Sequence, residues 1–310
     1  MSKYTTAELI ELLDKKDRRA FAKALSVIEN KDDGVMEILN YSYRNMTDHA
    51  LVIGITGPGG AGKSTAIDKI IKEFRIQGKR VGVIAVDPSS PYSGGAFLGD
   101  RIRMATHNVD QGVFIRSFAS RGSMGGISHS TKNSLYLYKT YDFDVIIVES
   151  LGIGQDETEI TNFVDVTVVT VVPGFGDAIQ MAKAGMQEIA DIFVINKSDK
   201  PDAEEFYQLM INSLIAIPEE IRPVILKTVA SNNIGIKELV DQIMIVGEKN
   251  MVKRRKKTIS RIKTEIETEI ILKLEAQIKS TVEAMSKKVF RNEATPFDVS
   301  EEILKHIEFH

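Results

Sequence analysis

The stretch Gly57-Pro58-Gly59-Gly60-Ala61-Gly62-Lys63-Ser64-Thr65 decides the fold of this chain. An apolar run over residues 51–56 precedes it and predicts a buried strand. Residues 66–77 follow with the apolar spacing of a helix. The pattern Gly-x-x-x-x-Gly-Lys-Ser between a strand and a helix is typical of a phosphate-binding loop.

Each part of this loop has a chemical role toward a polyphosphate. The glycines allow successive backbone N–H groups to point inward as an anion-binding nest, and the helix N-terminus adds its positive end. Lys63 would reach the β- and γ-phosphates, and the Ser64 hydroxyl would ligate Mg²⁺. We therefore assign to nucleotide binding the residues Gly57, Pro58, Gly59, Gly60, Ala61, Gly62, Lys63, Ser64 and Thr65.

The composition is that of a globular protein and argues against several classes of function. The 310 residues carry a formal net charge of −3, which does not suit a general nucleic-acid binder. The absence of cysteine excludes disulfides and thiolate metal sites and fits a reducing cytoplasm. The five histidines have no metal-binding spacing, and no apolar run reaches the ~18 residues of a membrane span. We expect a cytoplasmic protein that binds neither nucleic acid nor membrane.

From residue 51 apolar runs alternate with helical patterns, which predicts a parallel sheet covered on both faces. The predicted fold class is α/β, a P-loop NTPase with a mostly parallel central sheet flanked by helices. This domain would span residues 47–249. We expect its strands at residues 51–56, 81–86, 113–116, 144–149, 165–172, 191–195 and 223–229.

Helical segments are predicted on both sides of this domain. Residues 1–46 predict short helices, with Thr5 and Glu8 at capping-box spacing and a break near Asp17. Residues 250–310 predict one helix of roughly forty residues and then a short amphipathic helix. An apolar stripe marks the long helix: Ile259, Ile262, Ile266, Ile270, Leu274, Ile278, Val282, Met285 and Val289. Either the chain's own core or a second subunit must cover this stripe, and we expect a homodimer.

Acidic residues follow two of the predicted strands, at the sheet edge where open α/β folds bind ligands. Asp87 and Asp100 lie in the long connection after residues 81–86, and either could orient an attacking water. Glu149 ends the strand at 144–149, where an acid can hold Mg²⁺ through water. Gly152 would offer a backbone N–H to the γ-phosphate. We expect a metal site formed by Ser64, Asp87, Asp100 and Glu149, and catalytic roles for Lys63, Asp87, Asp100 and Glu149.

A second motif, Asn196-Lys197-Ser198-Asp199, follows the strand predicted at residues 191–195. Asp199 can accept hydrogen bonds from the N1–H and N2–H₂ groups of guanine, a pair of donors that adenine lacks. Lys197 can lie along the base plane, and Asn196 can tie this loop to the phosphate loop. After the last strand, the backbone N–H of Ala230 could bind guanine O6. These residues predict GTP and GDP as the bound nucleotides.

Together these motifs resemble those of the MeaB/ArgK family of G-protein chaperones for cobalamin-dependent acyl-CoA mutases. The resemblance covers nearly the whole chain, with motifs at residues 57–65, 86–90, 94–95, 98–100, 149–155, 196–199, 296–297 and 301–304. Ser150, Leu151, Ser198 and Val229 depart from the usual residues but remove no functional group. The resemblance implies a homodimer joined partly through C-terminal helices. It also implies GTP hydrolysis coupled to cofactor loading and protection of methylmalonyl-CoA mutase or a relative.

Other functions on a similar fold have weaker support in the sequence. A metallochaperone-type GTPase would need a Cys/His cluster, and this chain has no cysteine. A P-loop small-molecule kinase needs no guanine motif, so residues 196–199 count against it. A related group of ATPases carries a lysine at the second loop position, where this chain has Pro58.

The guanine motif gives a prediction that nucleotide binding can test. In an Asp199→Asn variant the side chain presents an N–H donor in place of an acceptor, which suits the carbonyl that xanthine carries at position 2. The variant should therefore bind GTP more weakly and xanthosine triphosphate more tightly than the parent does. Titration of both nucleotides measures this, and a variant that binds GTP as the parent does would show that the guanine assignment is wrong.

Overall fold

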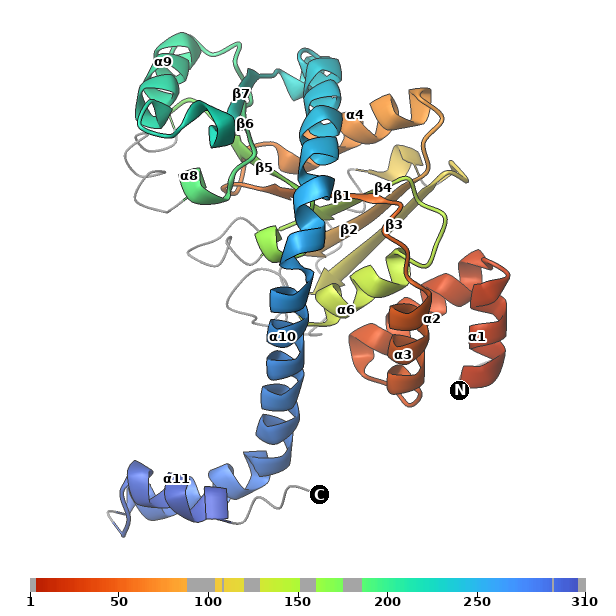
Figure 1. Cartoon of the computed structure of the whole chain (residues 1–310), viewed down its shortest axis with the longest axis vertical. Helices are drawn as coiled ribbons and strands as arrows, with labels where there is room; N and C mark the ends of the chain where they lie inside the picture. Colours follow the sequence, from red (N-terminus) through yellow and green to blue (C-terminus); the bar gives the residue numbers. More distant parts are fainter. Residues whose placement is uncertain are drawn as a thin grey trace. The chain divides into compact units, whose positions relative to one another are not determined.

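Seven strands, all parallel, form the central sheet in the computed structural model (Figure 1). The structure describes residues 4–87, 104–107, 109–119, 129–150, 160–174, 186–291 and 293–305. The strands are β1 Leu51–Thr56, β2 Val81–Asp87, β3 Val113–Ala119, β4 Val145–Glu149, β5 Val166–Val171, β6 Ile192–Ile195 and β7 Val224–Lys227. The predicted fold class and each predicted strand are confirmed, although β3 runs on to Ala119 and β7 stops at Lys227.

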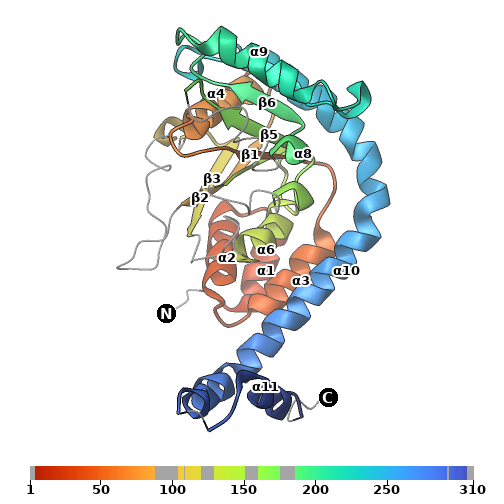
Figure 2. The same ribbon diagram turned by 90° about the vertical axis from the view of Figure 1, so that its left-hand side faces the viewer.

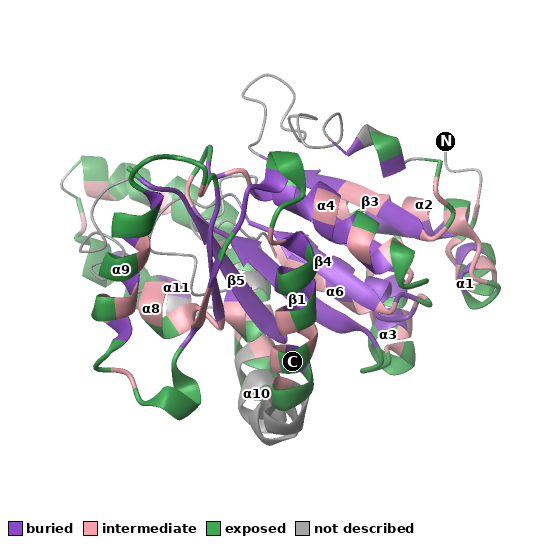
Figure 3. Cartoon of the chain, turned by 90° about the horizontal axis from the view of Figure 1, so that it is seen from above, coloured by how far each residue is buried: buried purple, intermediate pink, exposed green. Residues whose placement is uncertain are grey.

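One face of the sheet is covered by helix α4, Lys63–Ile76, and by the first turns of helix α10, which begins at Ile236. Successive side chains of a strand point to opposite faces, so alternate residues such as Ile53 and Ile55 meet these helices. Both isoleucines are fully buried. Figure 3 shows the strands buried along most of their length, as the apolar runs of the sequence require.

The opposite face carries helix α6, His129–Tyr138, and the three helices that precede the sheet (Figure 2). Those helices are α1 Thr6–Asp14, α2 Arg18–Asn30 and α3 Val35–Asn45. Phe21 of α2 is fully buried, with its ring centroid 4.9 Å from that of Phe114 and 5.2 Å from that of Tyr138. The N-terminal helices therefore share one hydrophobic core with the sheet.

The starts of the first two helices follow the capping signals in the sequence. The Thr5 side chain accepts a hydrogen bond from the Glu8 amide, and the Glu8 carboxylate accepts one from the Thr5 amide. Asp17 caps α2 by accepting from the amides of Arg19 and Ala20 at 2.9 and 2.7 Å. The predicted capping box and the break near Asp17 are confirmed.

Shorter elements fill the connections on the β7 side of the sheet. Helix α9, Ala203–Leu214, packs against buried residues of β5 and β6, among them Val169 and Phe193. Helix α8 spans Met186–Ile189, and 3₁₀ turns lie at η3 Glu219–Ile221 and η4 Ala230–Asn232. A further 3₁₀ turn, η1 Ala105–His107, lies in the connection between β2 and β3, at the opposite end of the strand order.

Helix α10, Ile236–Phe290, is longer than the sequence predicted. The prediction placed the start of this helix near residue 250, where charged residues begin. It therefore missed the first turns, which are apolar and pack on the sheet. Leu239, Val240 and Ile243 are fully buried there. The Asn250 side chain donates to the Asp165 carbonyl at 3.0 Å, which holds the helix at the end of this packed part.

The chain divides into two compact units, Met1–Val252 and Lys253–His310, and α10 contributes to both. In the second unit, α11, Pro296–Lys305, is joined to α10 by an ion pair of 3.8 Å between Lys288 and Glu302. In the described parts of the chain, no helix is both long and apolar enough to cross a membrane. The division into segments 1–46, 47–249 and 250–310 stays a prediction.

Candidate nucleotide-binding site

The functional motifs gather at one edge of the sheet because all the parallel strands end there. The strand order is β3-β2-β4-β1-β5-β6-β7, so the chain fills one side of β1 first and then returns to fill the other. Open α/β sheets bind ligands beyond the carboxyl ends of their strands, at the point where the strand order reverses. The phosphate loop leaves β1 at this point.

The phosphate loop has a backbone that requires glycine. Gly57, Gly60 and Gly62 have φ values of 132°, 78° and 89°, which L-residues rarely adopt. A Cβ on Gly57 would lie 2.0 Å from the Thr170 carbonyl oxygen, whereas one on Gly60 would meet no heavy atom within 4 Å. The loop is therefore packed where it leaves β1 and open at its tip. The Lys63 ammonium donates to the Gly57 carbonyl at 2.7 Å.

Three oxygen-bearing side chains lie buried beside this loop. The Ser64 hydroxyl, in the first turn of α4, donates to Glu149 Oε1 at 2.9 Å. Glu149 is paired with Ala85 of β2, and Asp87 lies two residues further along that strand, so its side chain is on the same face. Ser64 is 6% exposed, and Asp87 and Glu149 are each 2% exposed. The predicted neighbours Ser64, Asp87 and Glu149 therefore lie at one end of the adjacent strands β2 and β4.

The Asn196 side chain joins the guanine motif to the phosphate loop. Its Nδ2 donates to the Ala61 carbonyl at 2.8 Å. Its Oδ1 accepts from the Thr228 hydroxyl at 3.2 Å and from the Ala230 amide at 3.1 Å. A Cβ on Gly62 would lie 2.4 Å from Asn196 Nδ2, so this approach also requires glycine. The predicted tie between the two loops is present.

The remaining residues of the guanine motif lie at the surface. Lys197 has φ 56° and donates through Nζ to the Gly60 carbonyl at 3.0 Å. The Ser198 hydroxyl donates to the Thr228 carbonyl at 2.9 Å. Asp199 is exposed. Lys197 therefore reaches over the tip of the phosphate loop, and the Asp199 carboxylate is exposed to solvent.

The structure changes one assignment and adds two contacts that sequence reasoning missed. The Ala230 amide, predicted to bind guanine O6, donates to Asn196 in this state, so O6 would have to share that donor. The Ser150 hydroxyl donates to Thr56 Oγ1 at 2.6 Å and joins the end of β4 to the start of the phosphate loop. Thr228 fell within the strand predicted at residues 223–229, and no local pattern shows that it supports Asn196.

Two predicted site residues, Asp100 and Gly152, lie outside the described residues. Their assignments stay predictions. The described part of the site therefore consists of the phosphate loop, the two buried acids Asp87 and Glu149, and the guanine motif.

The phosphate loop after β1, the buried acids after β2 and β4, and a guanine motif tied to that loop define the class of protein, a P-loop GTPase. Residues 21–286 match the family described as methylmalonyl Co-A mutase-associated GTPase MeaB. Because the match spans most of the chain, the chain belongs to the MeaB family.

Relatives of known name agree with this class. A putative GTPase of Pyrococcus abyssi is 45% identical, and the match covers 97% of this chain and 96% of the relative. The GTPase ArgK of Escherichia coli is 34% identical over 76% of this chain and 74% of its own. The crystal structure of an LAO/AO transport system kinase superposes with a TM-score of 0.65 at 24% identity and covers 98% of both chains. That likeness supports the fold.

The Asn196 contacts predict a large effect of a single substitution. Asn196→Ala would leave the buried Ala61 carbonyl and Ala230 amide without this partner, at about 1–3 kcal/mol for each group. The free energy of unfolding should fall by about 2–6 kcal/mol and nucleotide binding should weaken. Urea unfolding and GDP titration measure both effects.

The matched control for that variant is Ser198→Ala, which removes one half-buried hydrogen bond in the same motif. It should cost less than about 1.5 kcal/mol. If the two variants lose stability and GDP affinity equally, the Asn196 side chain does not hold the two loops together.

Proposed function

We propose that this GTPase is Mg²⁺-dependent and acts as a chaperone for a cobalamin-dependent acyl-CoA mutase, methylmalonyl-CoA mutase or a relative. Membership of a family described as mutase-associated is the observation that carries the proposal. GTP binding and hydrolysis would be coupled to loading of the cobalamin cofactor onto the mutase and to its protection. The chain would act as a switch if the mutase distinguishes its GTP-bound and GDP-bound states.

The chemistry of the residues at the site fits a magnesium ion. Ser64, Asp87 and Glu149 all offer oxygen, the ligand atom that Mg²⁺ prefers, and all three are buried at the same end of the sheet. We propose Ser64 as a direct ligand and Glu149 as a residue that acts through water, with Asp87 and Asp100 as further members. When bound, the ion would neutralise charge on the β- and γ-phosphates.

The chain's own groups would bind the phosphates and orient water. Lys63 lies against the loop with its ammonium at the Gly57 carbonyl, from where it would bind the β- and γ-phosphates. Asp87 or Asp100 would orient the attacking water, and Gly152 would donate its N–H to the γ-phosphate. Each of these roles places a charge or a donor where negative charge develops in the reaction.

The base would be bound on the other side of the loop by the guanine motif. Asp199 would accept from N1–H and N2–H₂, and the stem of Lys197 would cover the base plane. Asn196 would not contact the base itself but would act indirectly, since its contacts hold the phosphate loop and the Ala230 amide in place. This arrangement would bind GTP and GDP in preference to adenine nucleotides.

Intrinsic hydrolysis should be slow without a partner. A phosphate loop positions and neutralises the phosphates, but turnover stays low until the water and the charge of the transition state are also organised. No sequence motif fixes an arginine at this site. We therefore propose that binding of the mutase raises the rate by ordering the segments at residues 87–103 and 152–155, most of which lie outside the described residues.

We also propose that the chain forms a homodimer through the second unit. Large apolar side chains of α10 keep more than a third of their surface exposed: Ile262, Ile266, Ile270, Ile271 and Val282. Covering one such side chain is worth about 1.5–3 kcal/mol, so several together can hold two chains. A second copy would present the same stripe and could cover them mutually.

The experiment that tests the chaperone proposal is a titration with the mutase. Addition of methylmalonyl-CoA mutase should raise the GTPase rate, and the mutase should bind the chain more tightly with a non-hydrolysable GTP analogue than with GDP. By linkage, the mutase must raise the affinity for the GTP analogue relative to GDP by the same factor, about 5- to 150-fold for typical coupling.

A Glu149→Gln variant serves as the control for that titration, since it should keep mutase binding but lose turnover. An unchanged rate together with equal mutase affinities in the two nucleotide states would refute the chaperone proposal and leave the GTPase alone.

The dimer proposal predicts the effect of charge on the exposed stripe. Ile266→Glu combined with Ile270→Glu should convert a dimer into a monomer, because two carboxylates would be buried between the chains. Lys273→Glu combined with Lys279→Glu, at exposed polar positions of the same helix, should leave the dimer intact. Light scattering reports the mass, and a parent chain that is monomeric at micromolar concentration would contradict the proposal.

A further inference from the structure

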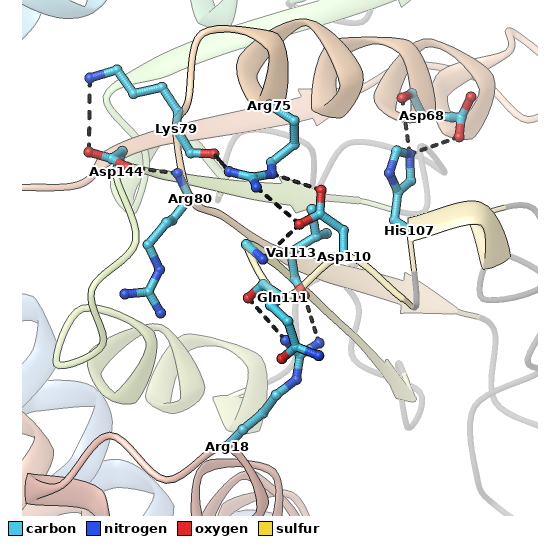
Figure 4. A network of polar contacts seen from close by, with 11 residues as sticks. Arg18, Asp68, Arg75, Lys79, Arg80, His107, Asp110, Gln111, Val113 and Asp144 are labelled. Carbon is cyan, nitrogen blue, oxygen red and sulfur yellow. Dashed lines mark hydrogen bonds and ion pairs between the residues drawn. The ribbon is translucent and has the colours of Figure 1, made fainter.

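A second network of polar contacts joins helix α4 to the residues that precede β3 (Figure 4). His107 of η1 meets Asp68 in the first half of the helix, and Asp110 meets Arg75 in its last turn. Sequence reasoning singled out none of these four residues. None of them has a place in the nucleotide site described above.

The pair of His107 and Asp68 is buried, and its donor and acceptor can be assigned. His107 Nε2 lies 2.9 Å from Asp68 Oδ1 and 3.2 Å from the Asp68 carbonyl oxygen. A carbonyl and a carboxylate can only accept, so Nε2 carries the proton. The Thr106 hydroxyl donates to the same Oδ1 at 3.2 Å. His107 is 5% exposed and Asp68 is 9% exposed. One imidazole therefore holds both the side chain and the backbone of Asp68.

The charges around Asp68 keep its carboxylate ionised. Burial by itself would raise the pKa of Asp68, but Lys69, Lys72 and His107 outweigh that effect and hold the pKa below its usual value. The ammonium groups of Lys69 and Lys72 lie 3.1 and 3.4 Å from Oδ2. The carboxylate is therefore an acceptor for His107 at neutral pH.

The second pair holds the same segment to the other end of the helix. Arg75 donates to both oxygens of Asp110, at 2.9 and 3.0 Å. The hydrogen bond from Arg75 holds the pKa of Asp110 below its usual value. Arg18 of α2 donates to the carbonyls of Gln111 and Val113 at 3.2 and 2.7 Å. None of these side-chain hydrogen bonds involves His107.

The two pairs differ in their distance from the phosphate loop. Asp68 follows Ser64 by one turn of α4 and lies on the same face of the helix, whereas Arg75 lies about three turns beyond Ser64. Without the contact at Asp68, the first turns of α4, which carry Lys63 and Ser64, would lose this polar contact and keep only their packing on the sheet. Without the Arg75 pair, the N-terminus would still be held at Asp68.

We propose that His107, acting through Asp68, is a positioning residue for GTP hydrolysis. It holds the first turns of α4 so that the Ser64 hydroxyl stays at its 2.9 Å contact with Glu149. The inference rests on the proposed Mg²⁺-dependent reaction, because Ser64 acts there as a ligand of the ion. A displaced Ser64 would impair use of Mg²⁺ more than binding of guanine, which depends on the loop after β6.

The test compares variants of the full chain by GTP hydrolysis as a function of MgCl₂ concentration. His107→Leu should lower kcat about 10- to 100-fold, the effect of misplacing a group near the reaction by about an ångström. It should also raise the Mg²⁺ concentration at half-maximal turnover. His107→Gln, whose Nε2 can replace the imidazole N–H, should restore both values toward those of the parent. Asp110→Ala, the matched control, should lower the unfolding temperature but keep the parent's kcat and Mg²⁺ dependence.

His107→Asn serves as a second removal variant if His107→Leu does not fold, because its side chain is too short to reach Asp68. The inference is overturned if the removal variant keeps the parent's Mg²⁺ dependence, or if Asp110→Ala changes kcat and Mg²⁺ dependence as the removal variant does. A parent chain that hydrolyses GTP without any need for Mg²⁺ would instead overturn the proposed reaction, and this inference with it.

Discussion

The Asn196 side chain makes the contacts on which the rest of the site depends. One amide donates to the phosphate loop at Ala61 and accepts from Thr228 and Ala230, which follow the last strand of the sheet. It can reach both loops because parallel strands end at the same edge. A side chain on Gly62 would collide with the Asn196 amide. The contact between the two loops therefore requires both the glycine of one motif and the asparagine of the other. That constraint holds the phosphate loop and the guanine motif, far apart in sequence, against each other.

The same edge of the sheet holds charge that the fold alone does not need. Lys63, Asp87 and Glu149 are buried, and the Ser64 hydroxyl donates to Glu149 beside them. Such a set is a poor way to stabilise a sheet that already has continuous apolar cores on both faces. The same set suits a site that binds a polyphosphate and a cation, because the ammonium would pair with the phosphates and the carboxylates with the cation. We propose that binding accounts for this arrangement, whereas the apolar strands and helices around it account for the stability of the domain.

Features that depend on neighbours in sequence could be predicted. The strands, the phosphate loop and the caps at Thr5 and Asp17 are set by local patterns, and the ends of β2 and β4 placed Asp87 and Glu149 correctly. Contacts between distant residues that belong to no motif could not be predicted, because no local pattern links Asp68 to His107, 39 residues later. The start of α10 was missed because the charged residues begin only near residue 250, whereas the first turns of the helix are apolar and pack on the sheet. Hydrogen bonding by the Ala230 amide depends on where the Asn196 oxygen points, which is a matter of tertiary packing.

The central claim is that one pocket binds the phosphates through the loop after β1 and guanine through the loop after β6. Calorimetric titration of the nucleotide-depleted chain with GDP and with ADP, in the presence of Mg²⁺, tests this claim most directly. A site that satisfies the guanine edge by hydrogen bonds should bind GDP more than about 100-fold more tightly than ADP. Equal affinities, or a preference for ADP, would contradict the account, since they would show that residues 196–199 do not read the base.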